Sequence, residues 1–239
     1  MNRIVEASSL EALAVFRRHP SLLLRTARGR VDVMKSHARI EVERAQKVLE
    51  DNRNLGLDEI VRIHEAVACY NYKSTYLYSI ARLAKPEVVI ETGVAAGISS
   101  FSILQALEDN KAGVLYSIDL PNATEKVPRR QEPGFLVPER LRPRWKLLLG
   151  DSRELLPSLV DRLGTIDVFC HDSLHTAEHM RFEYETAWPH IRSGGLLYSD
   201  DLDPSDVFAD FCRRLNLTAT VLSRREVGKS VRFGWVQKP

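Results

Sequence analysis

Cysteine is scarce in this 239-residue sequence, which contains only Cys69, Cys170 and Cys212. Their number is odd, and their spacing differs from that of zinc-binding motifs. We therefore expect neither a zinc site nor the disulfide framework on which small secreted domains depend. The three side chains are interpreted as reduced thiols in the protein core.

The sequence also lacks an excess of charge of one sign and any long apolar run. Its 34 lysines and arginines oppose 32 aspartates and glutamates, which leaves a formal net charge of +2. Proteins that bind the phosphate backbone of nucleic acids usually carry a clear basic excess. No window reaches the roughly 18 apolar residues of a membrane span, and the apolar stretch near the N-terminus is too short for a signal peptide. We expect no nucleic-acid partner, no membrane association and a cytoplasmic location.

The first third of the chain has few glycines and no strand-like alternation. From residue 9 to about residue 84, apolar residues recur at three- and four-residue spacings, which predicts helices. We assign residues 1–84 to a helical N-terminal segment that covers the binding site or forms a homodimer contact. Residues 85–239 would form the main domain. With 44% hydrophobic residues, the chain has enough material for a sizeable core.

From Pro86 onward, short strands rich in Val, Ile and Leu alternate with helical stretches. This alternation predicts an α/β fold with a parallel sheet, right-handed crossovers and helices on both faces. Two further strands, at 218–222 and 231–236, are joined by a link short enough for an antiparallel hairpin. The five earlier strands are expected at 88–91, 114–118, 146–149, 166–170 and 195–198, and the helices at 100–108, 153–163 and 177–191.

Small and polar residues follow the first strand, at the sheet edge where ligands bind in this class of fold. The stretch reads Glu91-Thr-Gly93-Val-Ala-Ala-Gly97-Ile-Ser99-Ser100. Its glycines permit a tight turn and the close approach of a ligand, and the following helix offers free N–H groups. It is neither the G-x-G-x-x-G of a dinucleotide-binding loop nor a phosphate loop ending in Gly-Lys-Ser/Thr. Taken alone, it also fits a plain turn between a strand and a helix.

The next two strands end in acidic residues. Asp119 follows the second strand, where a carboxylate can accept hydrogen bonds from both hydroxyls of a ribose. Asp151 follows the third strand and could accept from an adenine amino group, while Ser152 could cap the next helix. Each acid alone could equally be a cap. Three successive strand ends with acid or glycine favour a nucleoside site.

Five stretches, "VVIETGVAAGISS", "YSIDLP", "LLLGDSRELLP", "IDVFCHDSLHTAEHM" and "PHIRSGGLLYSDDLD", resemble in order and spacing the motifs of class I methyltransferases that use S-adenosylmethionine. The resemblance covers about residues 75–239. It is closest to the small-molecule O-methyltransferases that include cephalosporin-pathway and macrocin-type enzymes. It implies a Rossmann-like, seven-stranded sheet whose last strand is antiparallel, and it makes residues 85–239 the S-adenosylmethionine-binding methyltransferase domain.

The resemblance also implies roles for the residues at the strand ends. Glu91, Gly93 and Gly97 would line the methionine part of the cofactor, Asp119 would bind the ribose and Asp151 the adenine. The turn would then be open for a cationic sulfonium nucleoside rather than for a pyrophosphate. The full set expected at the cofactor is Glu91, Gly93, Gly97, Ser99, Ser100, Asp119, Asp151, Ser152 and Asp172.

Acids after the fourth and fifth strands are candidates for a metal site. Adjacent strand ends would bring Asp172, Asp200 and Asp201 together, and unpaired carboxylates repel one another unless a cation or proton intervenes. Oxygen ligands suit Mg²⁺. In the related enzymes such a metal anchors two vicinal oxygens of the acceptor and lowers the pKa of the hydroxyl to be methylated. Alternatively, Asp200 or Asp201 caps a helix that begins near Ser205, and Asp172 contacts only the cofactor.

The sequence departs from the related enzymes beside these acids. Leu174 stands where the pattern often has a second acid, and the asparagine that often follows the acid pair is absent. Both departures weaken the case for the metal and for Asp172 as a catalytic base. His175 remains at the mouth of the site, and an imidazole can take a proton near neutral pH. Its alternative role is to cap or pack over the helix start at Thr176.

The link from residue 121 to residue 145 is long for a crossover and contains five prolines and five arginines. We interpret it either as a lid or acceptor-site wall, whose arginines could meet a carboxylate or phosphate, or as a plain surface excursion. The arginines are Arg129, Arg130, Arg140, Arg142 and Arg144.

These observations predict an S-adenosylmethionine-dependent methyltransferase that methylates a hydroxyl of a small molecule, with Mg²⁺ as a candidate cofactor. His175 and Asp172 are the catalytic candidates. The departures at Leu174 and at the missing asparagine leave a second hypothesis open. In it the protein binds S-adenosylmethionine or S-adenosylhomocysteine without catalysing transfer. A nicotinamide oxidoreductase is disfavoured by the glycine spacing.

Overall fold

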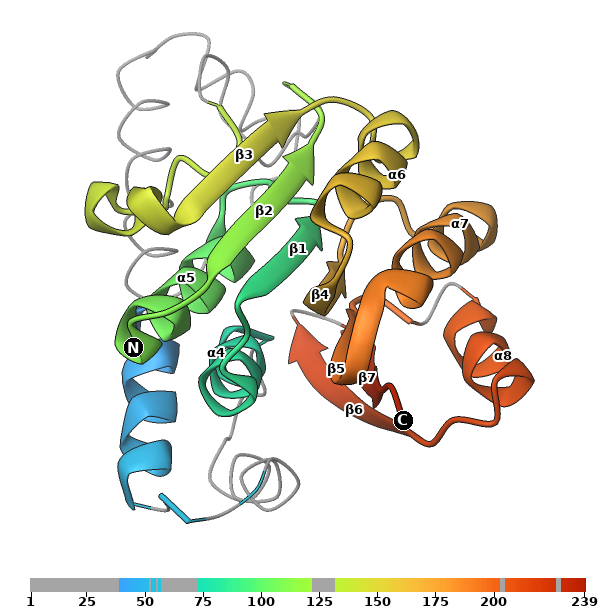
Figure 1. The fold of residues 1–239 in the computed structure, drawn as a ribbon. Coiled ribbons are helices and arrows are strands. Elements are labelled where there is room, and N and C mark those ends of the chain that lie inside the picture. The colour runs from blue at the N-terminus through green and yellow to red at the C-terminus, as the bar shows by residue number, and fades with distance from the viewer. Residues whose placement is uncertain are drawn as a thin grey trace, which may run out of the picture. The chain divides into compact units, whose positions relative to one another are not determined.

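The computed structural model describes residues 39–51, 53–54, 56, 73–121, 132–202, 205–226 and 229–239 (Figure 1). The helices expected before residue 39, and with them the homodimer contact, lie outside these ranges, as does Cys69. Cys170 and Cys212 are buried free thiols, as predicted. No helix within the described ranges has the length and apolar character needed to cross a membrane.

Seven strands form one sheet in the order β3-β2-β1-β4-β5-β7-β6 (Figure 1). The four pairs formed by β1 to β5 are parallel, whereas β7 is antiparallel to both β5 and β6. The predicted sheet with its antiparallel last strand is therefore confirmed. The strands are β1 (Val88–Thr92), β2 (Val114–Asp119), β3 (Trp145–Leu149), β4 (Ile166–His171), β5 (Ile191–Ser199), β6 (Ala219–Glu226) and β7 (Lys229–Gln237).

The strand order reverses at the centre of the sheet. After β1 the chain adds β2 and β3 on one side, and it then returns to add β4 and β5 on the other side. In α/β sheets of this kind, ligands bind beside the carboxyl ends of the strands at the point of reversal. Here that point lies between β1 and β4.

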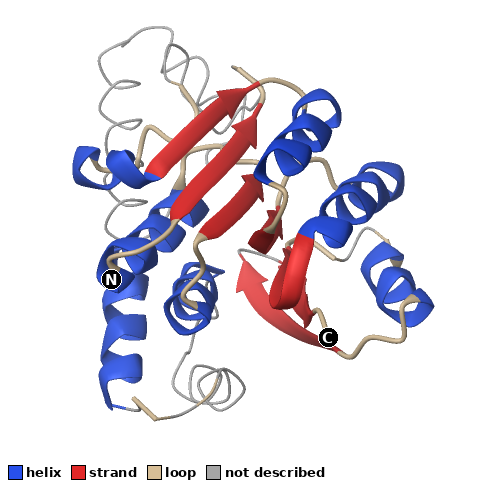
Figure 2. Ribbon diagram, in the orientation of Figure 1, coloured by secondary structure: helices blue, strands red, loops and turns tan. Residues whose placement is uncertain are grey.

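Helices cover both faces of the sheet (Figure 2). Consecutive residues of a strand point to opposite faces, and in the central strands both are buried. Val89 belongs to a buried cluster with α4 and α5, whereas its neighbour Ile90 belongs to a cluster with α6, α7 and α8. This two-sided burial explains the nearly continuous apolar runs of the strands. The helices are α4 (Lys73–Ala84), α5 (Ile98–Asn110), α6 (Ser152–Leu163), α7 (Ala177–Ala187) and α8 (Val207–Arg214).

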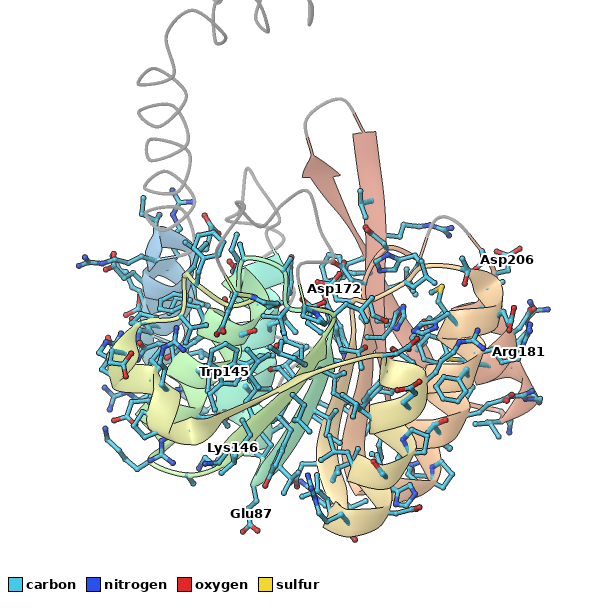
Figure 3. The ribbon with its side chains drawn as sticks, turned by 90° about the horizontal axis from the view of Figure 1, so that it is seen from above. Glu87, Trp145, Lys146, Asp172, Arg181 and Asp206 are labelled. Atoms are coloured by element: carbon cyan, nitrogen blue, oxygen red, sulfur yellow. The ribbon has the colours of Figure 1, made fainter. Side chains whose placement is uncertain are left out.

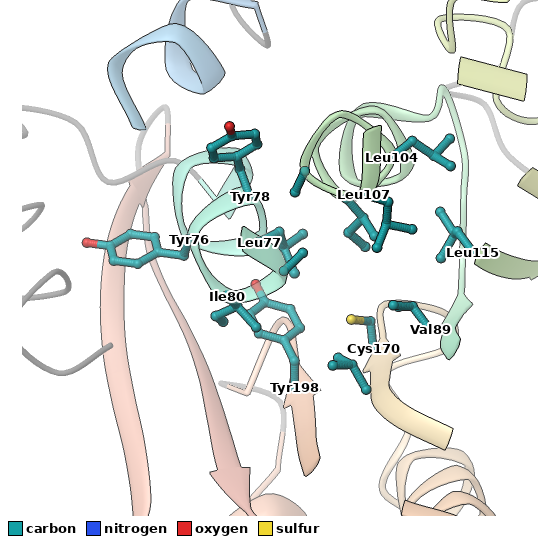
Figure 4. Close-up of a cluster of buried hydrophobic side chains, with 14 of the residues drawn as sticks. Tyr76, Leu77, Tyr78, Ile80, Val89, Leu104, Leu107, Leu115, Cys170 and Tyr198 are labelled. Atoms are coloured by element: carbon teal, nitrogen blue, oxygen red, sulfur yellow. The ribbon is translucent and has the colours of Figure 1, made fainter. Parts of the chain in front are cut away.

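Figure 4 shows the buried cluster beneath α4 and α5. Leu77 of α4 and Leu107 of α5 share this cluster with Leu115 of β2 and Cys170 of β4. The helix at 39–51 also contacts α4, since Thr75 Oγ1 of α4 donates a 2.8 Å hydrogen bond to a glutamate of that helix. The described end of the N-terminal segment is thus packed against the core of the main domain.

The helix expected to end at residue 191 ends four residues earlier. α7 ends at Ala187, a three-ten turn (η2, Trp188–His190) follows, and β5 begins at Ile191. Pro189 has no N–H to donate and its φ is fixed, which disfavours a continued α-helix. Ile191 is buried, so it extends the apolar spacing of the helix, but it is the first residue of a strand.

Two of the three arginines in the described part of the link bind a helix outside the link. This part contains the three-ten helix η1 (Glu139–Arg144), where Arg140 donates to Gln105 at 2.5 Å and Arg144 donates to Glu108 at 2.9 Å. Both acceptors belong to α5. Hydrogen bonds from a neighbouring lysine and from Arg144 lower the pKa of Glu108 to about 2. These two arginines therefore bind α5, and a contact of either with an acceptor stays a prediction. Positions 129 and 130 lie outside the described residues.

Candidate functional site

Two glycines allow the turn after β1 to come very close to its neighbours. Gly93 has a φ of +82°, and a Cβ atom there would lie 2.0 Å from the backbone oxygen of Asp172. Gly97 has a φ of +92°, and a Cβ atom there would lie 2.7 Å from Cα of Gly134. Glycine at both positions is thus explained by close approach within the chain itself. A contact of these glycines with a ligand stays a prediction.

The segment that approaches the turn is residues 133–137, which we call the strap. Gly134 N–H donates to the carbonyl of Ala95 at 2.8 Å, and Leu136 N–H donates to that of Ala96 at 3.0 Å. On its other side the strap meets Trp145 of β3, because a Cβ atom on Gly134 would lie 2.1 Å from the indole ring. The strap is held between the turn and this ring.

Glu91 lies near the carboxyl end of β1 and is buried. Its Oε2 accepts hydrogen bonds from Ser100 at 2.6 Å and from Ser117 at 2.8 Å. Ser117 in turn accepts from the indole N–H of Trp145 at 2.9 Å. The structure therefore joins the predicted residues Glu91 and Ser100, and it adds two partners that the sequence did not predict. Ser99 is buried beside Ser100 in the first turn of α5.

Asp119, at the end of β2, accepts hydrogen bonds from backbone N–H groups of the same turn. Its Oδ2 accepts from the backbone N–H groups of Val94 at 3.0 Å and Ala95 at 2.7 Å, and its Oδ1 accepts from that of Leu120 at 2.7 Å. Ala95 has a φ of +47°, which is unusual for a residue other than glycine. The aspartate thus supports a strained turn, consistent with the turn-cap alternative.

Asp151 is the residue that caps α6. Its backbone is extended, and its carboxylate accepts from the N–H of Arg153 at 2.8 Å. The predicted cap, Ser152, is wrong, because Ser152 is already the first helical residue. Its hydroxyl is buried and donates to Glu183 at 2.6 Å.

Glu183 of α7 is the centre of a buried polar network that the sequence did not predict. The side chain is fully buried. Because a carboxylate oxygen only accepts, all its partners are donors. The five contacts are Thr92 Oγ1 at 2.6 Å, Ser152 Oγ at 2.6 Å, His171 Nδ1 at 2.6 Å, Ser173 Oγ at 2.9 Å and His179 Nε2 at 2.9 Å.

These donors keep Glu183 ionised. Burial acts to raise the pKa of Glu183, but the hydrogen bonds from His171 and His179 outweigh it, so that this pKa lies well below its ordinary value. A signal for the network is present in the sequence. His179 and Glu183 are four residues apart and lie beside Met180 and Tyr184, which have the same spacing and are buried in the same helix. Polar residues on a buried helix face indicate partners inside the protein.

The acids after β4 and β5 lie at adjacent strand ends, as predicted. His171 and Ser199 are paired in register, and the N–H of Asp200 donates to the carbonyl of His171 at 3.0 Å. Figure 3 shows Asp172 at the carboxyl edge of the sheet, opposite the edge where Glu87 precedes β1. Neither Asp200 nor Asp201 caps the following helix, since α8 has Asp206 at its N-cap.

His175 lies between two of these acids. Its Nε2 is 3.8 Å from Asp172 Oδ1 and its Nδ1 is 3.9 Å from Asp201 Oδ2. The helix start at Thr176 is capped by Thr176 itself, so His175 does not act as the cap. Leu174 is 56% exposed beside the same acids. The two catalytic candidates predicted from the sequence, His175 and Asp172, are therefore neighbours.

The carboxylates do not converge on one point where a metal ion could be held. Within the described residues, no three His, Cys, Asp or Glu side chains are arranged to hold a metal ion. The side chain of Asp200 is buried, whereas those of Asp172 and Asp201 are partly exposed and approach the ring of His175. The predicted Mg²⁺ site at Asp172, Asp200 and Asp201 stays a prediction that this arrangement does not support.

Comparison with known proteins points to one family. Residues 90–202 match a family model described as a methyltransferase domain. Over 57 residues, 23% of this chain, the sequence is 35% identical to demethylmacrocin O-methyltransferase of Streptomyces fradiae, and the match spans 14% of that relative's length.

Solved structures share the fold. The O-methyltransferase TomG of Streptomyces achromogenes, in complex with SAM, has a TM-score of 0.53 and 18% identity over 83% of this chain and 89% of that one. An O-methyltransferase of Bacillus cereus, in complex with SAH, has a TM-score of 0.53 and 15% identity over 84% and 100%. Residues 90–202 thus match the methyltransferase-domain family model, and the sheet has the fold of these O-methyltransferase structures.

Proposed function

We propose that the protein is an S-adenosylmethionine-dependent methyltransferase that acts on an oxygen of a small molecule. The observation that carries the proposal is the convergence of the strand ends. Four acids lie at the carboxyl ends of β1 to β4, at the edge of the sheet where the strand order reverses between β1 and β4, within a methyltransferase domain: Glu91, Asp119, Asp151 and Asp172. The relatives named above are O-methyltransferases, which favours oxygen as the acceptor atom.

We propose that a ribose binds Asp119 while the hydrogen bonds between Asp119 and the turn are kept. A carboxylate offers about four acceptor positions, and three are used by backbone N–H groups. We propose that one ribose hydroxyl donates to the remaining position, and that the other hydroxyl shares a position with a backbone N–H group. Glu91, Gly93 and Gly97 would line the methionine part, and Asp151 would bind the adenine.

Bound S-adenosylmethionine would supply a methyl group that its sulfonium already activates. The protein then has to align the acceptor oxygen with this methyl carbon and remove the hydroxyl proton. The oxygen–carbon bond forms as the carbon–sulfur bond breaks. We propose that His175 takes the proton, with the carboxylates of Asp172 and Asp201 on either side to stabilise the imidazolium that results.

The sequence also predicts Mg²⁺ as a candidate cofactor of the reaction. The donor set fits poorly, because Leu174 replaces an acid and the imidazole of His175 lies between two of the three carboxylates. No step of the proposed reaction therefore passes through a metal ion. A comparison of transfer rates in Mg²⁺ and in EDTA would test this, and a rate that depends on Mg²⁺ would restore the metal to the mechanism.

Transfer of a labelled methyl group from S-adenosylmethionine to a panel of hydroxylated small molecules tests the proposal. Formation of a methyl ether is the expected result. The non-catalytic alternative remains as a second hypothesis, because Leu174 stands where related enzymes often have an acid. Binding of S-adenosylhomocysteine without transfer to any acceptor would favour that alternative. Binding of NAD in its place would contradict both.

A further inference from the structure

The five donors to Glu183 come from different parts of the fold. One is at the end of β1, one begins α6, two belong to the end of β4 and the loop after it, and one lies on α7 itself. The separation along the chain reaches 91 residues, between Thr92 and Glu183. A single buried carboxylate therefore connects three loops at the carboxyl edge of the sheet.

These donors are adjacent in sequence to the residues proposed to meet the ligands. Each of three proposed ligand contacts is therefore one residue away from a group that is hydrogen-bonded to Glu183. Thr92 precedes Gly93, Ser152 follows Asp151, and His171 and Ser173 flank Asp172.

Packing alone does not require this arrangement. Met180 and Tyr184, on the same helix face, fill their surroundings with apolar and aromatic contacts. An apolar side chain at position 183 could fill space without the desolvation cost of a buried charge. What a carboxylate with five donors adds is a fixed distance and direction between the groups that it joins.

We infer that Glu183 is a positioning residue, which holds the turn at Gly93, the loop at Asp151 and the loop at Asp172 at the separation that the cofactor requires. The inference rests on the proposed function, since it assumes that these loops bind S-adenosylmethionine. Glu183 itself does not touch the ligand. Its effect passes through the hydroxyls of Thr92 and Ser152 and through the imidazole of His171.

Removal of one donor hydroxyl tests the inference while Glu183 itself is left unchanged. Thr92 is fully buried, and Thr92→Val keeps its shape but cannot donate to Glu183. Thr92→Ser keeps the hydroxyl and loses only a methyl group. We expect Thr92→Val to weaken binding of S-adenosylhomocysteine by roughly five- to tenfold, the factor of about one hydrogen bond, and Thr92→Ser to bind like the wild type.

The measurement is calorimetric titration with S-adenosylhomocysteine, well below the unfolding temperature of each variant. Glu185→Gln is the matched control, because Glu185 lies on the same helix in an exposed ion pair with Arg214. Glu183→Gln, if folded, should weaken binding more than Thr92→Val. Folded Thr92→Val with wild-type affinity would overturn the inference alone, as would equal weakening by Thr92→Val and Thr92→Ser. Absence of binding by the wild type would overturn the proposed function as well.

Discussion

Asp119 shows how a single residue can serve both the fold and the proposed ligand. Its carboxylate holds Ala95 in a left-handed conformation that costs an ordinary residue about 1–2 kcal/mol. Such strain persists only where the surroundings enforce it, and it is concentrated at functional sites. The same carboxylate is the one proposed to accept from the ribose.

Replacement of Asp119 by alanine should therefore lower the affinity for S-adenosylhomocysteine by at least about tenfold, because hydrogen bonds to a charged group are lost. Calorimetric titration would measure this effect. Asp161→Ala, which removes an exposed carboxylate on α6, is the control and should leave the affinity unchanged. An unaltered affinity in Asp119→Ala would remove the ribose assignment.

His175 is the residue on which the proposed proton transfer depends. His175→Ala should reduce the rate of methyl transfer by roughly 10²–10⁴ while the affinity for S-adenosylhomocysteine stays near that of the wild type. Single-turnover transfer of a labelled methyl group would separate the two effects. His190→Ala, in the η2 turn, provides a matched loss of imidazole. A rate in His175→Ala equal to that in His190→Ala would rule out His175 as the base.

At the scale of the element, the strap is the part of the long link whose position is explained by specific contacts. Its backbone N–H groups donate hydrogen bonds to the carbonyls of Ala95 and Ala96, and the ring of Trp145 packs against Gly134. Gly134 also has a φ of +76°, so two independent reasons favour glycine there.

Gly134→Ala should lower the free energy of unfolding by about 2 kcal/mol more than Gly164→Ala does. Gly164 has a similar φ of +73°, but a Cβ atom there would meet nothing within 4 Å. The comparison therefore isolates the contact with Trp145 from the cost of the backbone conformation. Chemical denaturation would measure both variants, and equal destabilisation would show that the strap is not packed against the ring.

At the scale of the whole molecule, the network of Glu183 makes stability depend on pH. The pKa of Glu183 is depressed in the folded protein, so its contribution to stability is fully present above the unfolded value of about 4.3. The contribution is lost progressively as the pH falls below that value. Glu183→Gln should cost roughly 3–5 kcal/mol at pH 7, because buried donors lose a charged partner.

The difference in unfolding free energy between the wild type and Glu183→Gln should shrink as the pH is lowered from 6 to 3. Urea denaturation at several pH values would measure it. A difference that stays constant over this range would mean that folding does not lower the pKa of Glu183.

The sheet was predictable because its determinants are local. Apolar runs such as the one that ends at Glu91 define each strand, and the short link between β6 and β7 predicts their antiparallel pairing. The acids at the strand ends were predictable for the same reason. Glu183 was not, because its donors are up to 91 residues away, and only the folded sheet brings them together. The roles of Arg140 and Arg144 also depended on partners in another element.

The central claim is that the carboxyl edge of this sheet binds S-adenosylmethionine, and titration of the purified protein with S-adenosylhomocysteine tests it most directly. Parallel runs in Mg²⁺ and in EDTA would show whether a metal ion is coupled to binding. The proposed function predicts micromolar binding, on the order of −8 kcal/mol, of equal strength in both runs. A folded protein that binds no S-adenosylhomocysteine in either run would contradict it.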